Sequence, residues 1–180
     1  MVNVTHSFNS SIIRSYDIRG VFNKTLFEKD ARVIGQLFGL KVGKNNTVNI
    51  GYDGRHSSKP LKESLIEGIL ESGADVCEIG LVPTPLLYYS CIANKSEGGI
   101  MVTGSHNPSE YNGFKMVLAK HSFYAENIQS LQKLIDQDNL KLAQGEIINE
   151  DIKIEYTKRL LQNIYLNKKI KIAWDIGNGA

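Results

Sequence analysis

The chain has 180 residues, of which 42% are apolar, and it carries 21 Lys and Arg against 19 Asp and Glu. A domain of roughly 150 residues buries about 70% of the surface of its unfolded chain, so this chain is long enough to bury a hydrophobic core. The net charge of +2 gives no reason to expect nucleic acid or an anionic membrane as a partner. The first residues lack the basic and apolar regions of a leader, and no stretch reaches the ~20 apolar residues of a membrane span. We therefore expect a cytoplasmic protein.

Short apolar runs alternate along most of the chain with segments in which apolar residues recur at helical spacing. A capping box at 25–28 predicts the start of a helix that ends near Gly43, and Pro60 and Gly73 bracket a second helix. Strands are predicted at 47–51, 76–79 and 99–102 with a short segment at 114–118, and further helices at 86–93 and around 128–135. This alternation predicts an α/β fold, with a layered, mainly parallel sheet flanked by helices.

The pattern also predicts how the chain is divided. Residues 1–140 form one compact unit, and the periodic pattern is lost over 139–150, so 141–168 are interpreted as a connector followed by a linking helix. The segment 171–175 repeats the pattern of 48–53, an apolar strand that ends in an aromatic residue and Asp. Residues 169–180 are therefore expected to be the truncated start of a second domain.

The cysteines and most histidines carry no sign of a site. Cys77 and Cys91 lie in apolar surroundings, which indicates small buried thiols rather than a disulfide or a metal pair. His6, His56 and His121 belong to no motif, and surface positions are expected for all three.

A hydroxyl nucleophile follows the apolar run 99–102 directly. The loop Thr103-Gly104-Ser105-His106-Asn107-Pro108 places Ser105 at the end of a predicted strand, where a hydroxyl can accept or donate a transferable group. The same residue types also form ordinary turns, so the loop by itself leaves a structural interpretation open. The neighbouring motifs favour a catalytic role for the loop over a purely structural one.

Positively charged side chains lie in the loops around this serine. Arg19 and Arg55 lie beside Asp-containing glycine turns upstream, and Lys115 follows a second turn downstream. Loops at the same ends of neighbouring strands converge in an α/β sheet, so Arg19, Arg55, His106 and Lys115 are predicted to line one cleft. Such a cleft would attract phosphate.

Five motifs resemble a known family. They are Ser15-Tyr16-Asp17-Ile18-Arg19-Gly20, Gly51-Tyr52-Asp53-Gly54-Arg55, Val82-Pro83-Thr84-Pro85, the Thr103–Pro108 loop and Tyr111-Asn112-Gly113-Phe114-Lys115. In this order they closely resemble the first domain of the α-D-phosphohexomutases, most strongly the bacterial phosphomannomutase/phosphoglucomutase branch. The tail from Ile172 to Gly179 resembles the opening of the second domain of that family.

The resemblance implies a reaction. Ser105 would carry a phosphoryl group, give it to mannose or glucose 1- or 6-phosphate, and take the other phosphoryl group back from the 1,6-bisphosphate. A phosphoserine adds up to about −2 charge, so Mg²⁺ and fixed donors are needed around it. Ser105 would supply one Mg²⁺ ligand, and the family's second domain would supply the others.

The resemblance also assigns roles to the other residues of these motifs. His106 and Asn107 would orient the phosphoryl group, Lys115 would transfer a proton or neutralise charge, Tyr16 and Arg19 would support Lys115 and the substrate, and Arg55 would support the phosphate. The plain alternatives are a solvated lysine at position 115 and a core or rim aromatic at position 16.

Three interpretations remain open at this stage. In the family, the metal loop, the sugar loop and the substrate-phosphate site belong to domains two to four, so the 180 residues alone are expected to be nearly inactive. The chain is then one half of a mutase whose other domains lie on a separate chain, or a noncatalytic binding fragment. An unrelated serine hydrolase using Ser105 and His106 is less favoured, because adjacent residues on an extended segment point apart. The sequence leaves the choice between mannose and glucose open.

Overall fold

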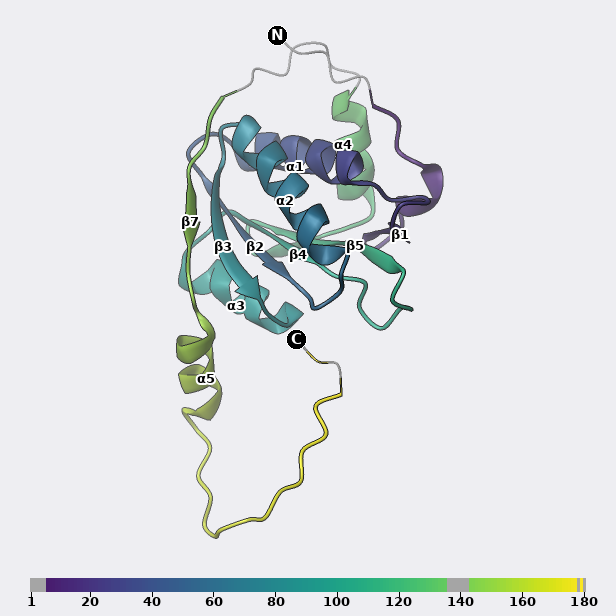
Figure 1. Cartoon of the computed structure of the whole chain (residues 1–180). Helices are drawn as coiled ribbons and strands as arrows, with labels where there is room; N and C mark the ends of the chain where they lie inside the picture. Colours follow the sequence, from purple (N-terminus) through teal and green to yellow (C-terminus); the bar gives the residue numbers. More distant parts are fainter. Residues whose placement is uncertain (1–5, 136–142, 178, 180) are drawn as a thin grey trace.

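A computed structural model describes residues 6–135, 143–177 and 179, and shows a seven-stranded sheet covered by helices (Figure 1). The strand order is β1-β5-β4-β2-β3-β7, and β6 pairs with the outer part of β5. The strands are β1 Ile18–Val21, β2 Thr47–Tyr52, β3 Asp75–Leu81, β4 Gly98–Val102, β5 Tyr111–Leu118, β6 His121–Phe123 and β7 Ile147–Asn149. The helices are the 3-10 turn Ser10–Ile12 and α1 Glu28–Val42, α2 Ser58–Glu71, α3 Thr84–Ala93, α4 Glu126–Ile135 and α5 Lys153–Leu161.

The layered α/β fold is confirmed, and its sheet is mixed. Strands β4, β2, β3 and β7 run parallel to one another, as the alternation of strands and helices predicts. Strands β1, β5 and β6 form antiparallel pairs. The direction reverses where β4 continues into β5 through a loop rather than through a helix, and only antiparallel neighbours can be joined that way. That connecting loop is the one that carries Ser105.

Helices cover both faces of the sheet (Figure 1). The larger core lies under α1, α2 and α4, and it includes Phe38, Leu65, Ile100 and Phe114. A smaller core lies on the opposite face, where α3 packs against β2 and β4. None of the described helices is both long and apolar enough to cross a membrane.

The start of α1 differs from the expected capping box. Phe27 is the N-cap residue, and its backbone N–H is bound by the carboxylate of Asp30, 2.7 Å away. The hydroxyl of Thr25 instead accepts the N–H of Val21 at 2.9 Å. The prediction that Thr25 caps α1 is therefore wrong, because that hydroxyl closes the tight turn after β1. The helix ends at Gly43 as expected, where φ is +93° and glycine is favoured.

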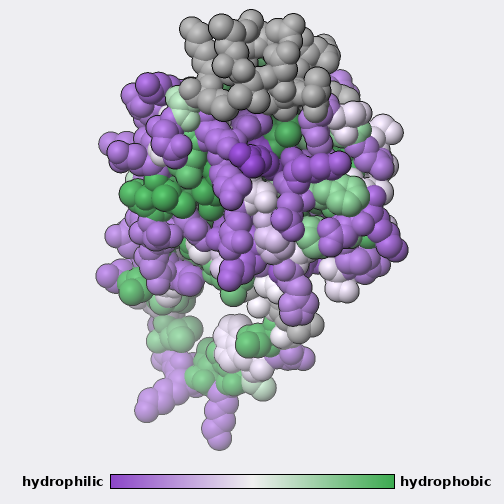
Figure 2. Space-filling view, turned by 45° about the horizontal axis from the view of Figure 1, so that its top comes forward, coloured by the Kyte–Doolittle hydropathy of each residue, from purple (hydrophilic) through white to green (hydrophobic). Residues whose placement is uncertain are grey.

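The C-terminal part departs from the sequence prediction in two places. The connector expected at 141–168 contains β7, a short strand that extends the sheet beside β3. The segment 171–175 forms no strand, since among the described residues nothing pairs with its backbone. Trp174 is 80% exposed, and Figure 2 shows green apolar side chains among purple ones on the part that projects below the domain. The boundary predicted at residue 140 lies outside the described residues.

The histidines do not all lie at the surface. His121 is exposed as expected. His6 is not, because only 10% of its side chain is exposed and its Nε2 lies 2.7 Å from the buried carboxylate of Asp30. The surface prediction for His6 is wrong because a terminal segment without periodicity gives no sign of the partner that it meets in space.

Cys77 and Cys91 are free and buried, as the sequence predicts. Burial raises the pKa of the Cys77 thiol to about 12, and the nearby carboxylate of Glu150 acts in the same direction. Burial likewise raises the pKa of Cys91 to about 11. Both groups are neutral thiols near neutral pH.

We expect both thiols to react at least 100-fold more slowly with a disulfide reagent at pH 8 in the folded protein than in urea, because thiolate is the reactive form. Each folded-state pKa lies above the ordinary thiol value of 9.0, so ionisation disfavours the folded state and stability falls as the pH rises above about 9. Absorbance of the released thiolate measures the rates. Equal reaction rates in the folded protein and in urea would contradict the assignment of both cysteines as buried thiols with raised pKa.

Candidate functional site

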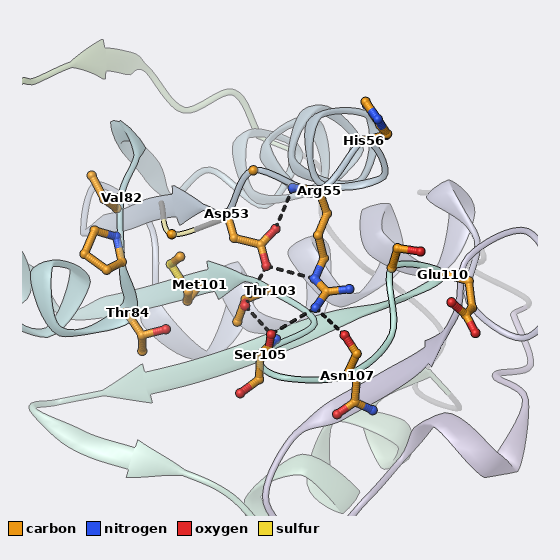
Figure 3. Close-up of a pocket in the computed structure, with 14 residues that line it drawn as sticks. Asp53, Arg55, His56, Val82, Thr84, Met101, Thr103, Ser105, Asn107 and Glu110 are labelled. Atoms are coloured by element: carbon orange, nitrogen blue, oxygen red, sulfur yellow. Dashed lines mark hydrogen bonds and ion pairs between the residues drawn. The ribbon is translucent and has the colours of Figure 1, made fainter. Parts of the chain in front are cut away.

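A cavity of about 780 Å³ opens where β2, β3 and β4 end (Figure 3). The residues that follow these three parallel strands face one another across it, as expected at the carboxyl ends of strands in an open sheet. Its lining includes Asp53, Gly54, Arg55, His56, Val82, Pro83, Thr84, Met101, Thr103, Ser105, Asn107, Ser109 and Glu110.

Ser105 is half-buried in this lining and has an unusual backbone. Its φ angle is +57°, in the left-handed region that non-glycine residues seldom adopt. Its hydroxyl has one neighbour among the described polar groups, Nδ1 of His106 at 3.5 Å, the long limit of a hydrogen bond. The hydroxyl is thus open to the cavity with little to hold it.

The backbone of the loop is held firmly on its N–H side. The Asp53 carboxylate accepts the hydroxyl of Thr103 at 2.8 Å and the N–H of Gly104 at 3.2 Å. The Thr103 oxygen in turn accepts the N–H of Ser105 at 2.8 Å. These bonds fix the two residues that lead from β4 into the turn.

Arg55 holds the carbonyl side of the same loop (Figure 3). Its guanidinium donates to Asp53 through Nε and, through Nη1 and Nη2, to four backbone carbonyls at 2.6 to 3.1 Å. The carbonyls belong to Ser105, Asn107, Pro108 and Tyr111. An arginine has five N–H donors, and all are used here. This geometry argues against Arg55 as a phosphate ligand and assigns it to the loop instead.

Arg19 and Asn107 form a second contact between β1 and the loop. Nη1 of Arg19 donates to Oδ1 of Asn107 at 2.8 Å, and Nη2 pairs with the buried carboxylate of Asp17. With its oxygen occupied, the amide nitrogen of Asn107 has no hydrogen-bond partner among the described residues. It remains a donor on the rim of the cavity.

Lys115 lies on the cavity side of the sheet. It pairs in register with Met101, whose side chain lines the cavity, so the two side chains project from the same face. It is half-buried and forms no ion pair with any described residue. Of the four cations expected to line one cleft, the lining includes Arg55 but not Arg19, His106 or Lys115, so this prediction is wrong for three of them.

Comparison with known proteins agrees with this arrangement. The family model "Phosphoglucomutase/phosphomannomutase, alpha/beta/alpha domain I" matches residues 10–141. The chain belongs to this family. A phosphomannomutase/phosphoglucomutase of Pseudomonas putida is 44% identical over 94% of the chain and 37% of its own length. A phosphoglucomutase of Neisseria meningitidis is 39% identical over 96% of the chain and 38% of its own length.

A solved structure shares the fold of this mutase-family chain. A phosphoglucomutase/phosphomannomutase family protein from Burkholderia thailandensis superposes with a TM-score of 0.83 at 37% identity, over 90% of the chain and 38% of that structure. The chain therefore spans less than two fifths of the length of these relatives.

Tyr16 lies away from the cavity, and His56 lies at its border. Tyr16 is 80% exposed, stacks on Tyr124 with ring centroids 6.3 Å apart, and is absent from the cavity lining. His56 is exposed, as predicted, and it borders the cavity just before α2.

His106 bears on the serine hydrolase interpretation. The sequence predicts that its side chain points away from Ser105, yet Oγ and Nδ1 approach to 3.5 Å because the backbone turns at Ser105. A hydrolase also needs a third group to orient the histidine. Among the described residues no carboxylate bonds to the other ring nitrogen of His106. Labelling of Ser105 by a serine-reactive phosphonate would favour this reaction.

Sequence reasoning does not single out two residues of the site, one directly after β2 and one at the start of the Ser105 loop. Asp53 and Thr103 belong to the motifs without a predicted role, yet they hold the backbone around Ser105. The signal was available, since a carboxylate at a strand end beside an arginine often organises a neighbouring loop. Its target, the loop after a different strand, is visible only in three dimensions.

The described residues do not by themselves fit a Mg²⁺ site. They contain no cluster of three or more His, Cys, Asp or Glu side chains placed around one metal ion. Mg²⁺ is usually held by one or two carboxylates together with phosphate oxygens. Both oxygens of Asp53 are already engaged by donors of the loop and of α2.

Proposed function

We propose that this chain is the phosphoserine-bearing first domain of a phosphohexomutase that interconverts mannose or glucose 1-phosphate and 6-phosphate. The main support is the Ser105 hydroxyl, which faces a large cavity without a strong partner while the backbone around it is tied down. A group that must alternately hold and release a phosphoryl group needs such freedom on a rigid base. The names of the relatives add to this support.

In the proposed reaction, Ser105 Oγ attacks the phosphorus of a hexose 1,6-bisphosphate. The new O–P bond forms as the bond from phosphorus to the sugar oxygen breaks, the serine proton is lost and the sugar oxygen gains one. Lys115 would supply or accept a proton and offset charge. Its half-buried ammonium has no acidic partner among the described residues, which supports this role. The reverse step, on the other sugar oxygen, completes the interconversion.

Asn107 and His106 are the proposed contacts to the phosphoryl group. The free amide nitrogen of Asn107 is a fixed donor, since Arg19 holds the opposite end of that amide. Nδ1 of His106 stands beside Ser105 Oγ. Donors placed before the reaction stabilise charge on the transferring oxygens without having to reorganise.

We further propose that Mg²⁺ takes part, with Ser105 supplying one ligand and the other ligands lying outside the described residues. The ion would offset the charge of the phosphorylated serine, and one oxygen of Ser105 would be among its ligands. The chain covers 37% of the Pseudomonas putida relative, so the sugar and metal sites of a working mutase would come from further residues of the same polypeptide or from a separate chain. The alternative is a noncatalytic fragment.

Mass spectrometry of the protein purified from its native cells tests the proposal. We expect one phosphoryl group on Ser105, which disappears in Ser105→Ala and persists in Ser109→Ala. Ser109 is a matched control because it is an exposed serine lining the same cavity. Ser105 free of phosphate in the unaltered protein, after hexose bisphosphate has been supplied, would favour the noncatalytic fragment.

A further inference from the structure

A continuous path of hydrogen bonds runs beneath the Ser105 loop. The buried amide of Asn112 on β5 donates to the hydroxyl of Ser58 at the start of α2, at 2.9 Å. Ser58 donates to Oδ1 of Asp53, and Oδ2 of Asp53 accepts the hydroxyl of Thr103. Thr103 finally accepts the N–H of Ser105.

The four side chains that lead to Ser105 along this path are largely shielded from water. Asn112 and Ser58 are fully buried, Thr103 is 6% exposed and the side chain of Asp53 is 15% exposed. A buried polar group that loses its partner is costly, so such a network holds one arrangement in preference to others. The path joins β5, α2, the end of β2 and the end of β4, and it therefore fixes the loop relative to the whole sheet.

Arg55 connects the same carboxylate, that of Asp53, to the carbonyl group of Ser105. It pairs with Asp53 through Nε at 3.2 Å and donates through Nη2 to the carbonyl of Ser105 at 2.9 Å. The N–H of Ser105 is bound through Thr103 and its C=O through Arg55, and both of these residues are anchored on the same carboxylate.

The backbone of Ser105 needs this support. Its φ angle of +57° is unfavourable for a residue with a side chain, and such conformations persist where the surroundings determine them. We propose that Thr103 and Arg55, anchored on Asp53, are positioning residues that hold Ser105 in the left-handed conformation and thereby set the direction of its hydroxyl. The proposal deepens the proposed function and rests on it for its chemical consequence.

The test compares Thr103→Val with Thr103→Ser. Valine keeps the shape of threonine and removes the hydroxyl, so the N–H of Ser105 and the carboxylate of Asp53 both lose a partner, whereas serine keeps both bonds. Two quantities are measured on the full chain purified from its native cells: the backbone HN–Hα coupling of Ser105 by NMR, which reports φ, and the phosphoryl content of Ser105 by mass spectrometry. Thermal unfolding shows that each variant is folded.

We expect Thr103→Val to change the coupling and to lower the phosphoryl content at least tenfold, with Thr103→Ser matching the unaltered protein in both. An unchanged coupling and phosphoryl content in a folded Thr103→Val protein would overturn the proposal. If that variant does not fold, Thr103→Ala removes the same bonds without placing a methyl group where the hydroxyl lay, and its result is interpreted in the same way. If the unaltered protein carries no phosphate even after hexose bisphosphate has been supplied, the proposed function fails, and the coupling alone decides whether Thr103 positions Ser105.

Discussion

Replacing Arg55 with alanine is expected to lower the free energy of unfolding by about 3–5 kcal/mol, the usual cost of removing one partner from a buried ion pair. The side chains of Arg55 and Asp53 are each only 15% exposed, so water replaces the lost guanidinium poorly. Four backbone carbonyls of the Ser105 loop lose their donor in the same step. Chemical denaturation followed by circular dichroism measures the loss.

Arg32→Ala is the matched control for Arg55→Ala. Arg32 also pairs with carboxylates, Glu67 and Glu71, but its side chain is 49% exposed. Exposed pairs contribute about 0–1 kcal/mol, so Arg32→Ala should cost no more than that. The role assigned to Arg55 would be refuted by equal losses in the two variants. An Arg55→Ala protein as stable as the unaltered protein would show that the Ser105 loop keeps its conformation without Arg55.

The second large effect is expected at the contact between α1 and α2. A Cβ added at Gly68 would lie 1.9 Å from the backbone oxygen of Arg32, and one added at Gly35 would lie 2.2 Å from that of Leu65. The two helices touch backbone to backbone, so neither can yield by a side-chain rotation. We expect Gly68→Ala to cost about 2–3 kcal/mol despite the gain of about 1 kcal/mol in helix propensity, because overpacking outweighs propensity in a core. Calorimetric unfolding measures the difference.

Glu63→Ala separates the clash from the effect of alanine itself. Glu63 is an exposed residue of the same helix, and substitutions at such positions change stability by less than about 0.5 kcal/mol. An unchanged melting temperature in Gly68→Ala would mean that α1 and α2 can separate without loss. The close approach of the two helices would then have no energetic role.

The sequence was informative where the pattern is local. Helix α1 ends at Gly43 and β4 lies over Gly98–Val102, as apolar spacing and glycine placement predict. The family resemblance depended on short runs of adjacent residues and was confirmed by the match over residues 10–141. Local signals failed where a partner lies far along the chain. His6 meets Asp30, β7 joins β3, and the segment 171–175 has no strand beside it.

The sequence by itself determined the α/β class, the family and the identity of the serine as the candidate carrier, because each depends on residue types at fixed spacing along the chain. The tertiary structure decided what Arg55 does. A guanidinium can bind either a phosphate or a set of carbonyls, and which of them it binds depends on the acceptors that lie within about 3 Å of it. Here those acceptors come from a loop some fifty residues away, and folding alone brings them together.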